Sequence, residues 1–352
     1  MTIVFAILLF SFLIFIHELG HFVAAKLSGV QVNEFALFMG PAIWKKQIGE
    51  TLYAIRTIPI GGYCAMEGED EDTDNPRAFT KAVWWKRLII LVAGAAMNFV
   101  AGVLIFAIVF LPAQQIVVPV INTITDCSLL QENGLQQGDL FLEIDAEPVY
   151  VQSDVDMLLS LSTKEIHDVV VLRNGERIRL PGALVPHTCV DEKGQEYVHY
   201  GFSYGEIKPL DLVGRLDYVW KNVINTVRNV RLSLQMIISG QAGIQDMSGP
   251  VGIVSMMNDV AEESEDSFTA VMNMLYFGGF IAINLAVMNL LPIPALDGGR
   301  VVGVVISAAY EGITKKRLDP KYEGVVHAVG MVLLLGLMAI IMFKDVFTIF
   351  MG

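Results

Sequence analysis

Charged residues are scarce in this chain, and their scarcity narrows the class of protein. Only 17% of the 352 residues are charged, against 54% that are hydrophobic, whereas about 25% are charged in a typical soluble domain. Basic residues are especially few, 24 against 37 acidic ones, which gives a formal net charge of −13. Nucleic-acid binding needs a basic surface, so we exclude a nucleic-acid partner. The composition instead favours a membrane protein.

Four apolar stretches are long enough to cross a bilayer, which takes about 20 predominantly apolar residues. We predict transmembrane helices at residues 1–28, 87–112, 267–296 and 325–344. The first stretch lacks the basic start and the small-residue cleavage site of a signal peptide, so we expect it to be retained. The predicted fold class is therefore a polytopic α-helical membrane protein with four transmembrane helices.

Basic residues between these stretches predict the orientation. Lys86 and Arg87 lie at the start of the second stretch, and Lys315, Lys316 and Arg317 lie between the third and the fourth. Because basic loops stay in the cytoplasm, we expect 29–86 to be a cytoplasmic, membrane-associated β-loop and 297–324 to be a cytoplasmic loop. The segment between the second and third stretches then lies on the other side of the membrane.

That outer segment is predicted to contain a small mixed β domain at 115–205. Apolar, β-branched runs at 116–124, 140–144, 168–172 and 177–180 are separated by turn signals, and one helix is expected near 152–161. Residues 206–266 follow as a connector, in which Leu212, Leu216 and Val219 begin an apolar series with helical spacing. Such an amphipathic helix lies on a membrane surface or packs beneath the domain.

The stretch "LLQENGLQQGDLFLEIDAEPV" at 129–149 resembles the PDZ domains of bacterial envelope proteases. This resemblance implies that the extracytoplasmic domain captures an extended peptide by strand addition. A spacer or steric plug with the same fold is the alternative. Ala146 stands where that family usually has glycine, so a different turn is expected there.

The first apolar stretch contains "HELGH" at 17–21. His17 and His21 are four residues apart and project from one face of a helix, where two imidazoles can bind one metal ion. Glu18 lies about 100° round the helix, within reach of a water molecule at that metal, as in the His-Glu-x-x-His motif of zinc proteases. Ionisable groups within a spanning helix are costly and indicate function. Hydrogen bonding to neighbouring helices would explain one histidine, but not two at this spacing.

A catalytic zinc site usually takes a third protein ligand. Asp297 is the candidate, because it directly follows the third apolar stretch, which Pro292 and Pro294 interrupt. His327 is the competing histidine, and as a lone histidine near the start of the last stretch we expect it to be interfacial.

With both motifs the chain resembles the site-2 protease family of intramembrane zinc metalloproteases, in the branch of the bacterial regulators of sigma-E protease type. "HELGH" at 17–21 and "LDG" at 296–298 match its two motifs, and "IPIGGYCAMEGEDE" at 58–71 and "SGPVGIV" at 248–254 match further segments. The resemblance runs nearly end to end. The chain has length for one PDZ domain, whereas well-known members carry two.

The resemblance implies that His17, His21 and Asp297 bind Zn²⁺ and that Glu18 is the general base. It further implies that Asn289 and Asn284 lie near the substrate, although hydrogen bonding to the carbonyls of the broken helix is an equally good account of them. Residues 51–66 read as a β-hairpin-like element with Gly61 and Gly62 at its bend, and the resemblance suggests that it pairs with an unwound substrate.

The expected function is regulated intramembrane proteolysis in a bacterial inner membrane, with single-pass membrane-anchored proteins such as anti-sigma factors or signal-peptide remnants as substrates. The alternatives are a catalytically silent PDZ-bearing scaffold and a metal transporter, and Glu18 argues against both because neither needs a base beside the metal. The sequence leaves open the oligomeric state and whether Cys127 pairs with Cys189. A second metal site at His187, Cys189 and His199 is discounted, because these residues lie in a predicted exposed hairpin.

Overall fold

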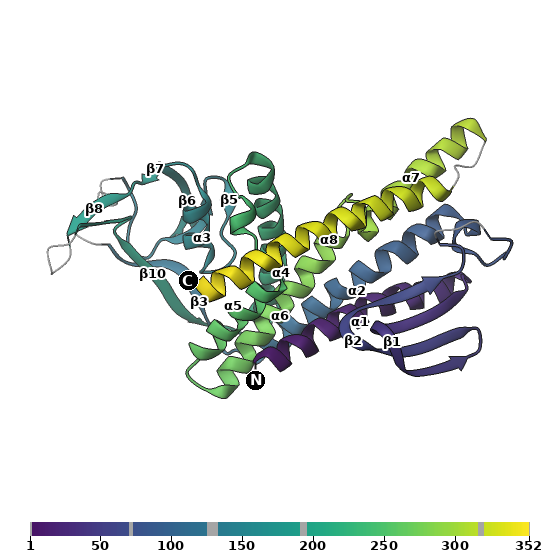
Figure 1. Ribbon diagram of the computed structural model, residues 1–352. Coiled ribbons are helices and arrows are strands. Elements are labelled where there is room, and N and C mark those ends of the chain that lie inside the picture. The colour runs from purple at the N-terminus through teal and green to yellow at the C-terminus, as the bar shows by residue number, and fades with distance from the viewer. Residues whose placement is uncertain (1, 70–72, 125–132, 191–195, 316–319, 352) are drawn as a thin grey trace. The chain divides into compact units, whose positions relative to one another are not determined.

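A computed structural model describes residues 2–69, 73–124, 133–190, 196–315 and 320–351. The chain divides into two compact units (Figure 1). Unit 1 combines Met1–Val109 with Thr226–Gly352, and unit 2 is Phe110–Asn225. The first and last thirds of the chain therefore fold together, and the middle third is an insertion.

Four helices among the described residues are long and apolar enough to cross a membrane. They are α1 (Thr2–Ser28), α2 (Trp84–Phe110), α6 (Ser267–Asn289) and α8 (Pro320–Met351). The predicted number of spans is confirmed, with different ends. α6 stops at Asn289 instead of residue 296, because Pro292 and Pro294 cannot continue the helical hydrogen bonds.

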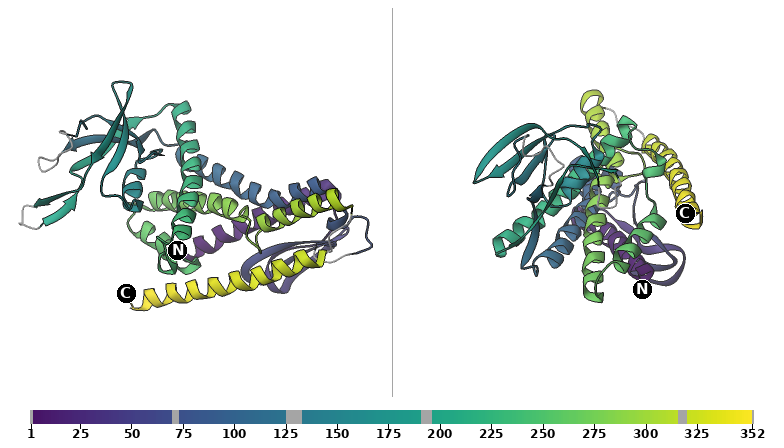
Figure 2. Two further views of the ribbon diagram at one scale, coloured as in Figure 1. Left: turned by 90° about the horizontal axis from the view of Figure 1, so that it is seen from above. Right: turned by 90° about the vertical axis from the view of Figure 1, so that its left-hand side faces the viewer.

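Helices α1, α2 and α6 lie side by side in unit 1 (Figures 1 and 2), and glycines permit their close approach. A Cβ atom at Gly20 of α1 would lie 2.4 Å from the carbonyl oxygen of Ala93 in α2. At Gly102 of α2 it would lie 2.6 Å from Cγ1 of Ile283 in α6. Small residues at such crossings are typical of helices packed in membranes. The three helices thus form the body that holds the candidate site.

Strands β1 (Val32–Ile48) and β2 (Thr51–Met66) form a two-stranded sheet whose tip is Gly49 and Glu50. Gly61 and Gly62, where the sequence predicts a bend, lie inside β2. The long strands are irregular, and residues 34–37 of β1 pair with both 52–55 and 62–65 of β2. Gly61 has φ of 78°, a conformation that glycine adopts without strain, so β2 curls there and passes alongside α1.

Two short 3-10 helices and two further α-helices also belong to unit 1. They are η1 (Phe79–Lys81), η2 (Ile244–Asp246), α5 (Pro250–Glu262) and α7 (Asp297–Thr314). α7 occupies part of the segment 297–324 that was predicted to be a loop. Val304 of α7 is completely buried. The basic residues after this helix and the two consecutive glycines in its first turn hid the helix in the sequence.

The last helix, α8, is tied to α5 by one buried carboxylate. Oδ2 of Asp345 accepts hydrogen bonds from the backbone amides of Gly249 and Gly252, each at 2.9 Å. These amides belong to the first turn of α5, where helical amides lack partners within the helix. Asp345 is 5% exposed, and its charge is stabilised by the positive end of the helix dipole.

Unit 2 is a mixed β domain, as predicted. Its sheet has the order β10-β3-β4-β6-β7, with β5 paired to β4. The strands are β3 (Gln115–Ile124), β4 (Leu140–Ile144), β5 (Glu147–Pro148), β6 (His167–Arg173), β7 (Glu176–Leu184) and β10 (Phe202–Pro209), accompanied by helix α3 (Asp154–Leu161) and by the separate pair β8 (His187–Val190) and β9 (Glu196–His199). Phe141, Ile144 and Val171 form part of its buried core.

The turn between β4 and β5 contains the residue that departs from the PDZ pattern. Asp145 and Ala146 have φ of 50° and 68°, the left-handed pair that a two-residue hairpin of this kind requires. The chain forms this turn with alanine at a left-handed position, at a cost of about 1–2 kcal/mol for the left-handed Cβ. Residues 129–132, where the motif begins, lie outside the described part.

Helix α4 (Leu212–Ser239) starts in unit 2 and continues into unit 1. It occupies the predicted amphipathic connector. In the part of α4 that belongs to unit 2, Val219 and Val223 are buried, whereas Val213 and Leu216 are exposed. The apolar residues of this helix therefore lie on both its buried and its exposed faces.

Candidate metal centre

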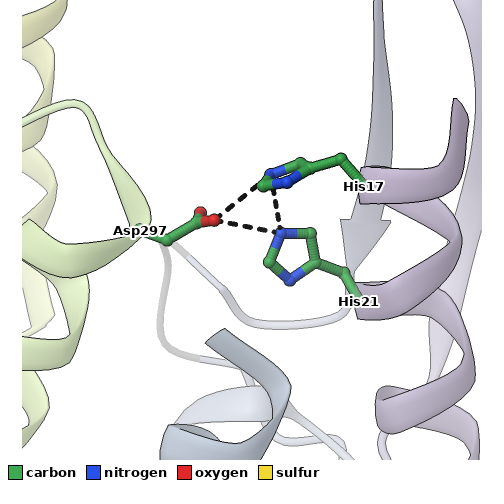
Figure 3. A group of neighbouring side chains, drawn as sticks. All are labelled: His17, His21 and Asp297. Carbon is green, nitrogen blue, oxygen red and sulfur yellow. Dashed lines mark hydrogen bonds and ion pairs between the residues drawn. The ribbon is translucent and has the colours of Figure 1, made fainter. Parts of the chain in front are cut away.

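Two histidines of α1 and one aspartate of α7 come together in unit 1 (Figure 3). His17 and His21 are one helical turn apart, so both rings leave α1 on the same side. Both rings point toward the carboxylate of Asp297, the first residue of α7. The three residues predicted as ligands are therefore adjacent, although 276 or more positions separate the histidines from the aspartate.

The chain between α6 and α7 turns sharply to place Asp297. A Cβ atom at Gly298 would lie 2.2 Å from the carbonyl oxygen of Leu291, so only glycine lets the start of α7 pack onto this turn. Ala295 has φ of 81°, a conformation that costs an alanine about 1–3 kcal/mol. The backbone amide of Ala295 donates to Nδ1 of His327 in α8, at 3.2 Å. His327, expected to be interfacial, therefore supports the turn that carries Asp297.

The three side chains present their donor atoms to one point. Oδ2 of Asp297 lies 3.2 Å from Nε2 of His17 and 3.3 Å from Nε2 of His21, and the two Nε2 atoms are 3.2 Å apart. Donor atoms at the usual zinc distances on a tetrahedron are about 3.3 Å from one another. The three separations therefore match one face of a tetrahedral zinc site.

The chemistry of these atoms also fits a cation. Oδ2 of Asp297 is buried and has no hydrogen-bond partner among the described residues. A carboxylate oxygen beside two imidazole nitrogens brings three lone pairs together, an arrangement that a divalent cation stabilises and that is costly without one. Two nitrogen ligands and one carboxylate leave a fourth position for water or substrate, as in catalytic zinc sites.

Helix α2 closes the site behind the histidines. Nδ1 of His21 lies 2.8 Å from the carbonyl oxygen of Ile90, which fixes the ring and leaves Nε2 to face Asp297. A Cβ atom at Gly94, one turn further along α2, would lie 2.3 Å from Nε2 of His21 and 2.8 Å from Cε1 of His17. Gly94 therefore makes room for the two rings.

Glu18 follows His17 on α1 and faces the curled part of β2. A Cβ atom at Gly62 would lie 3.5 Å from Cγ of Glu18 and 3.2 Å from Cγ2 of Ile14. The β2 backbone thus passes next to the predicted general base. The sequence predicts a bend at Gly62 but does not indicate that this residue lies next to Glu18.

The remaining predicted site residues lie at different places in unit 1. Asn284 and Asn289 are half-buried on the last two turns of α6, and within the described residues neither forms a hydrogen bond to the three ligands. Sequence reasoning missed Gly94 and the carbonyl of Ile90. The small residues of "AGAAMN" at 93–98, at helical spacing within a spanning segment, were the available signal.

Cysteine chemistry does not enter this site. Cys64 is buried in β2, and burial raises the pKa of its thiol far above the usual value, so the sulfur stays protonated and is a poor metal ligand. Across the side chains that the structure describes, His17, His21 and Asp297 are the group arranged to bind a metal. Cys127 lies outside the described residues, as does the side chain of Cys189, so their pairing stays open.

Comparison with known proteins gives one family over nearly the whole chain. The model of peptidase family M50 matches residues 5–337. A Clostridium acetobutylicum protein provisionally named a zinc metalloprotease is 37% identical over 345 residues, which cover 98% of this chain and 97% of that protein. The regulator of sigma-W protease RasP of Bacillus subtilis is 25% identical over 436 aligned positions, covering 99% of both chains. The zinc metalloprotease RasP of Bacillus licheniformis is 26% identical over a similar span.

Proposed function

The chain belongs to peptidase family M50, and we propose that it is a zinc metalloprotease in which His17, His21 and Asp297 bind the metal and Glu18 is the general base. The single observation that carries the residue assignment is the convergence of two imidazole nitrogens and one carboxylate oxygen at 3.2–3.3 Å. Its relatives bear the names of zinc metalloproteases and of a regulator of sigma-W protease. Regulated intramembrane proteolysis is the corresponding function.

Zinc, when bound, polarises the scissile carbonyl and acidifies a water molecule beside it. The side chains of this chain supply the rest. Glu18 accepts a proton from the attacking water and delivers it to the leaving amide nitrogen, because a carboxylate next to the ligands is placed for both transfers. The ring of His21 is held by the carbonyl of Ile90, so that the ligand geometry does not change during the reaction.

A helical substrate hides its peptide bonds, and β2 offers the means to extend it. The β2 backbone passes next to Glu18 at Gly62, where a glycine leaves the strand accessible. A substrate segment that pairs with this strand would present its peptide groups to the base and the metal ligands. Asn284 and Asn289, near the end of α6, supply amides for the same extended segment.

We place the protein in a bacterial inner membrane as a multi-pass protein, with unit 2 as an extracytoplasmic PDZ-like domain. The basic loops support this orientation, and the sheet with its retained Asp145-Ala146 turn supports the PDZ-like fold. The substrates are single-pass, membrane-anchored proteins, such as anti-sigma factors or signal-peptide remnants. The scaffold and transporter alternatives are not favoured, since the chain keeps both the base and a complete ligand set.

The test separates metal binding from proton transfer. Glu18→Gln keeps the three ligands, so purified protein should retain about one zinc per chain while cleavage of a reporter transmembrane substrate falls by roughly 10²–10⁴-fold, the usual contribution of a general base. His17→Ala removes a ligand and should lose both zinc and activity. Normal cleavage by Glu18→Gln would refute the role of Glu18, and full zinc content in His17→Ala would refute the ligand assignment.

A further inference from the structure

Two buried polar atoms, one in a proposed ligand of α1 and one in the neighbouring helix α2, have no hydrogen-bond partner among the described residues. One is Nδ1 of His17 and the other is Oδ1 of Asn98 in α2. Asn98 is only 2% exposed and lies in the middle of a spanning helix, where a polar side chain without a partner is costly and marks function. A donor and an acceptor are thus both unsatisfied in one region.

The helix geometry brings these two atoms toward each other. Asn98 is one turn beyond Gly94, and positions i and i+4 share a helix face. Helical side chains lean toward the N-terminus of their helix, so the Asn98 amide covers the turn that contains Gly94. A Cβ atom at Gly94 would lie 2.8 Å from Cε1 of His17, and Nδ1 is bonded to Cε1. The absence of a side chain at Gly94 leaves the path between amide and imidazole open.

Metal binding would favour a hydrogen bond between the imidazole of His17 and the amide of Asn98. With Nε2 of His17 facing Asp297 at 3.2 Å, the proton of the neutral imidazole must lie on Nδ1. Metal-binding histidines almost always donate this proton to an acceptor, which fixes the ring and raises its basicity. His21 has such an acceptor in the carbonyl of Ile90, whereas Nδ1 of His17 has no acceptor among the residues that the structure describes.

We propose that Asn98 is a positioning residue for the metal centre: its Oδ1 accepts the Nδ1 proton of His17, directly or through one bridging water, when the metal is bound. This inference rests on the proposed function, because it presumes that His17 is a ligand. The alternative explanation of Asn98 is a polar contact that holds two helices together, but such a contact would give the amide oxygen a hydrogen-bond partner in the protein. Among the described residues this oxygen has no partner.

The experiment compares the zinc affinity of four variants with that of the unaltered protein, measured by competition with a chelator. Asn98→Ala removes the acceptor, and Asn98→Leu removes it with little change in volume, so both should bind zinc about 10–100-fold more weakly, as is typical when the partner of a ligand histidine is lost. Asn98→Asp keeps an acceptor oxygen at the same place and should retain the affinity. Ile105→Ala is the packing control, because Ile105 is buried on the same helix, 8% exposed, and contributes no polar atom.

A second measurement reports the ligand geometry without catalysis. The visible spectrum of the Co²⁺-loaded protein should change in Asn98→Ala and Asn98→Leu but not in Ile105→Ala. Excess zinc should restore cleavage in the two weakened variants. Unchanged affinity in both Asn98→Ala and Asn98→Leu, or an equal loss in Asn98→Asp or in Ile105→Ala, would overturn the inference. If the unaltered protein bound no zinc, the proposed function would fail instead, so the two failures are distinguishable.

Discussion

Gly94→Ala tests whether the proposed metal centre depends on the lack of a side chain at this position of α2. The added Cβ atom would lie 2.3 Å from Nε2 and 2.7 Å from Cε1 of His21, and 2.8 Å from Cε1 of His17. All three distances are far below van der Waals contact, so either the rings or the helices must move. His21 cannot turn away cheaply, because its Nδ1 is held at 2.8 Å by the carbonyl of Ile90.

The size of the effect follows from the cost of overpacking, typically about 1–3 kcal/mol. If this cost falls on the metal-bound arrangement, zinc affinity drops by roughly 5- to 150-fold, since 1.4 kcal/mol corresponds to a factor of ten. Helix propensity works in the opposite direction, because alanine is about 1 kcal/mol more favourable than glycine within a helix. The fold of the variant should therefore be kept while the site is damaged.

The assay is chelator competition for zinc, alongside thermal unfolding in the same detergent. Gly102→Ala is the matched control, because its Cβ atom would lie 2.6 Å from Cγ1 of Ile283, an apolar clash on the same helix two turns from Gly94. The control should lose stability without losing zinc affinity. If Gly94→Ala bound zinc as tightly as the unaltered protein, the reasoning that this glycine makes room for the histidines would be wrong.

Two further predictions concern stability. Asp345→Ala leaves the amides of Gly249 and Gly252 without a charged acceptor. Each such hydrogen bond is worth about 1.5–3 kcal/mol, so the midpoint of thermal unfolding should fall clearly, and Asp345→Asn should recover part of the loss. Equal midpoints in the unaltered protein and both variants would contradict a stabilising role for Asp345. Burial pushes the pKa of Asp145 upward, but hydrogen bonds led by that from His167 outweigh it and hold the pKa below its usual value. A lowered folded-state pKa stabilises the domain above the unfolded-state value, and this stability is lost in acid. Hydrogen-exchange protection in unit 2, taken relative to the intrinsic exchange rate at each pH, should therefore fall as the pH drops below about 4, and less so in Asp145→Asn. The same acid dependence of protection in both proteins would exclude this carboxylate as the cause.

Local sequence patterns were enough to predict the candidate metal ligands and the helices that carry them. Spacing of four places His17 and His21 on one face of any helix, and an uninterrupted apolar stretch permits only a helix within a bilayer. Asp297 followed from the same local reasoning, because Pro292 and Pro294 end α6 just before it. Short strands such as β4, with flanking turn signals, were likewise local properties.

Tertiary structure alone decided how the surroundings of the site are built. Gly94 is an ordinary member of an apolar helix until α2 packs against α1, and only then does it make room for the histidine rings. The position of Gly62 next to Glu18 depends on a curl in β2 that strand periodicity does not encode. These features arise from contacts between segments far apart in sequence, and a one-dimensional pattern carries no information about which side of a helix or strand another segment will occupy.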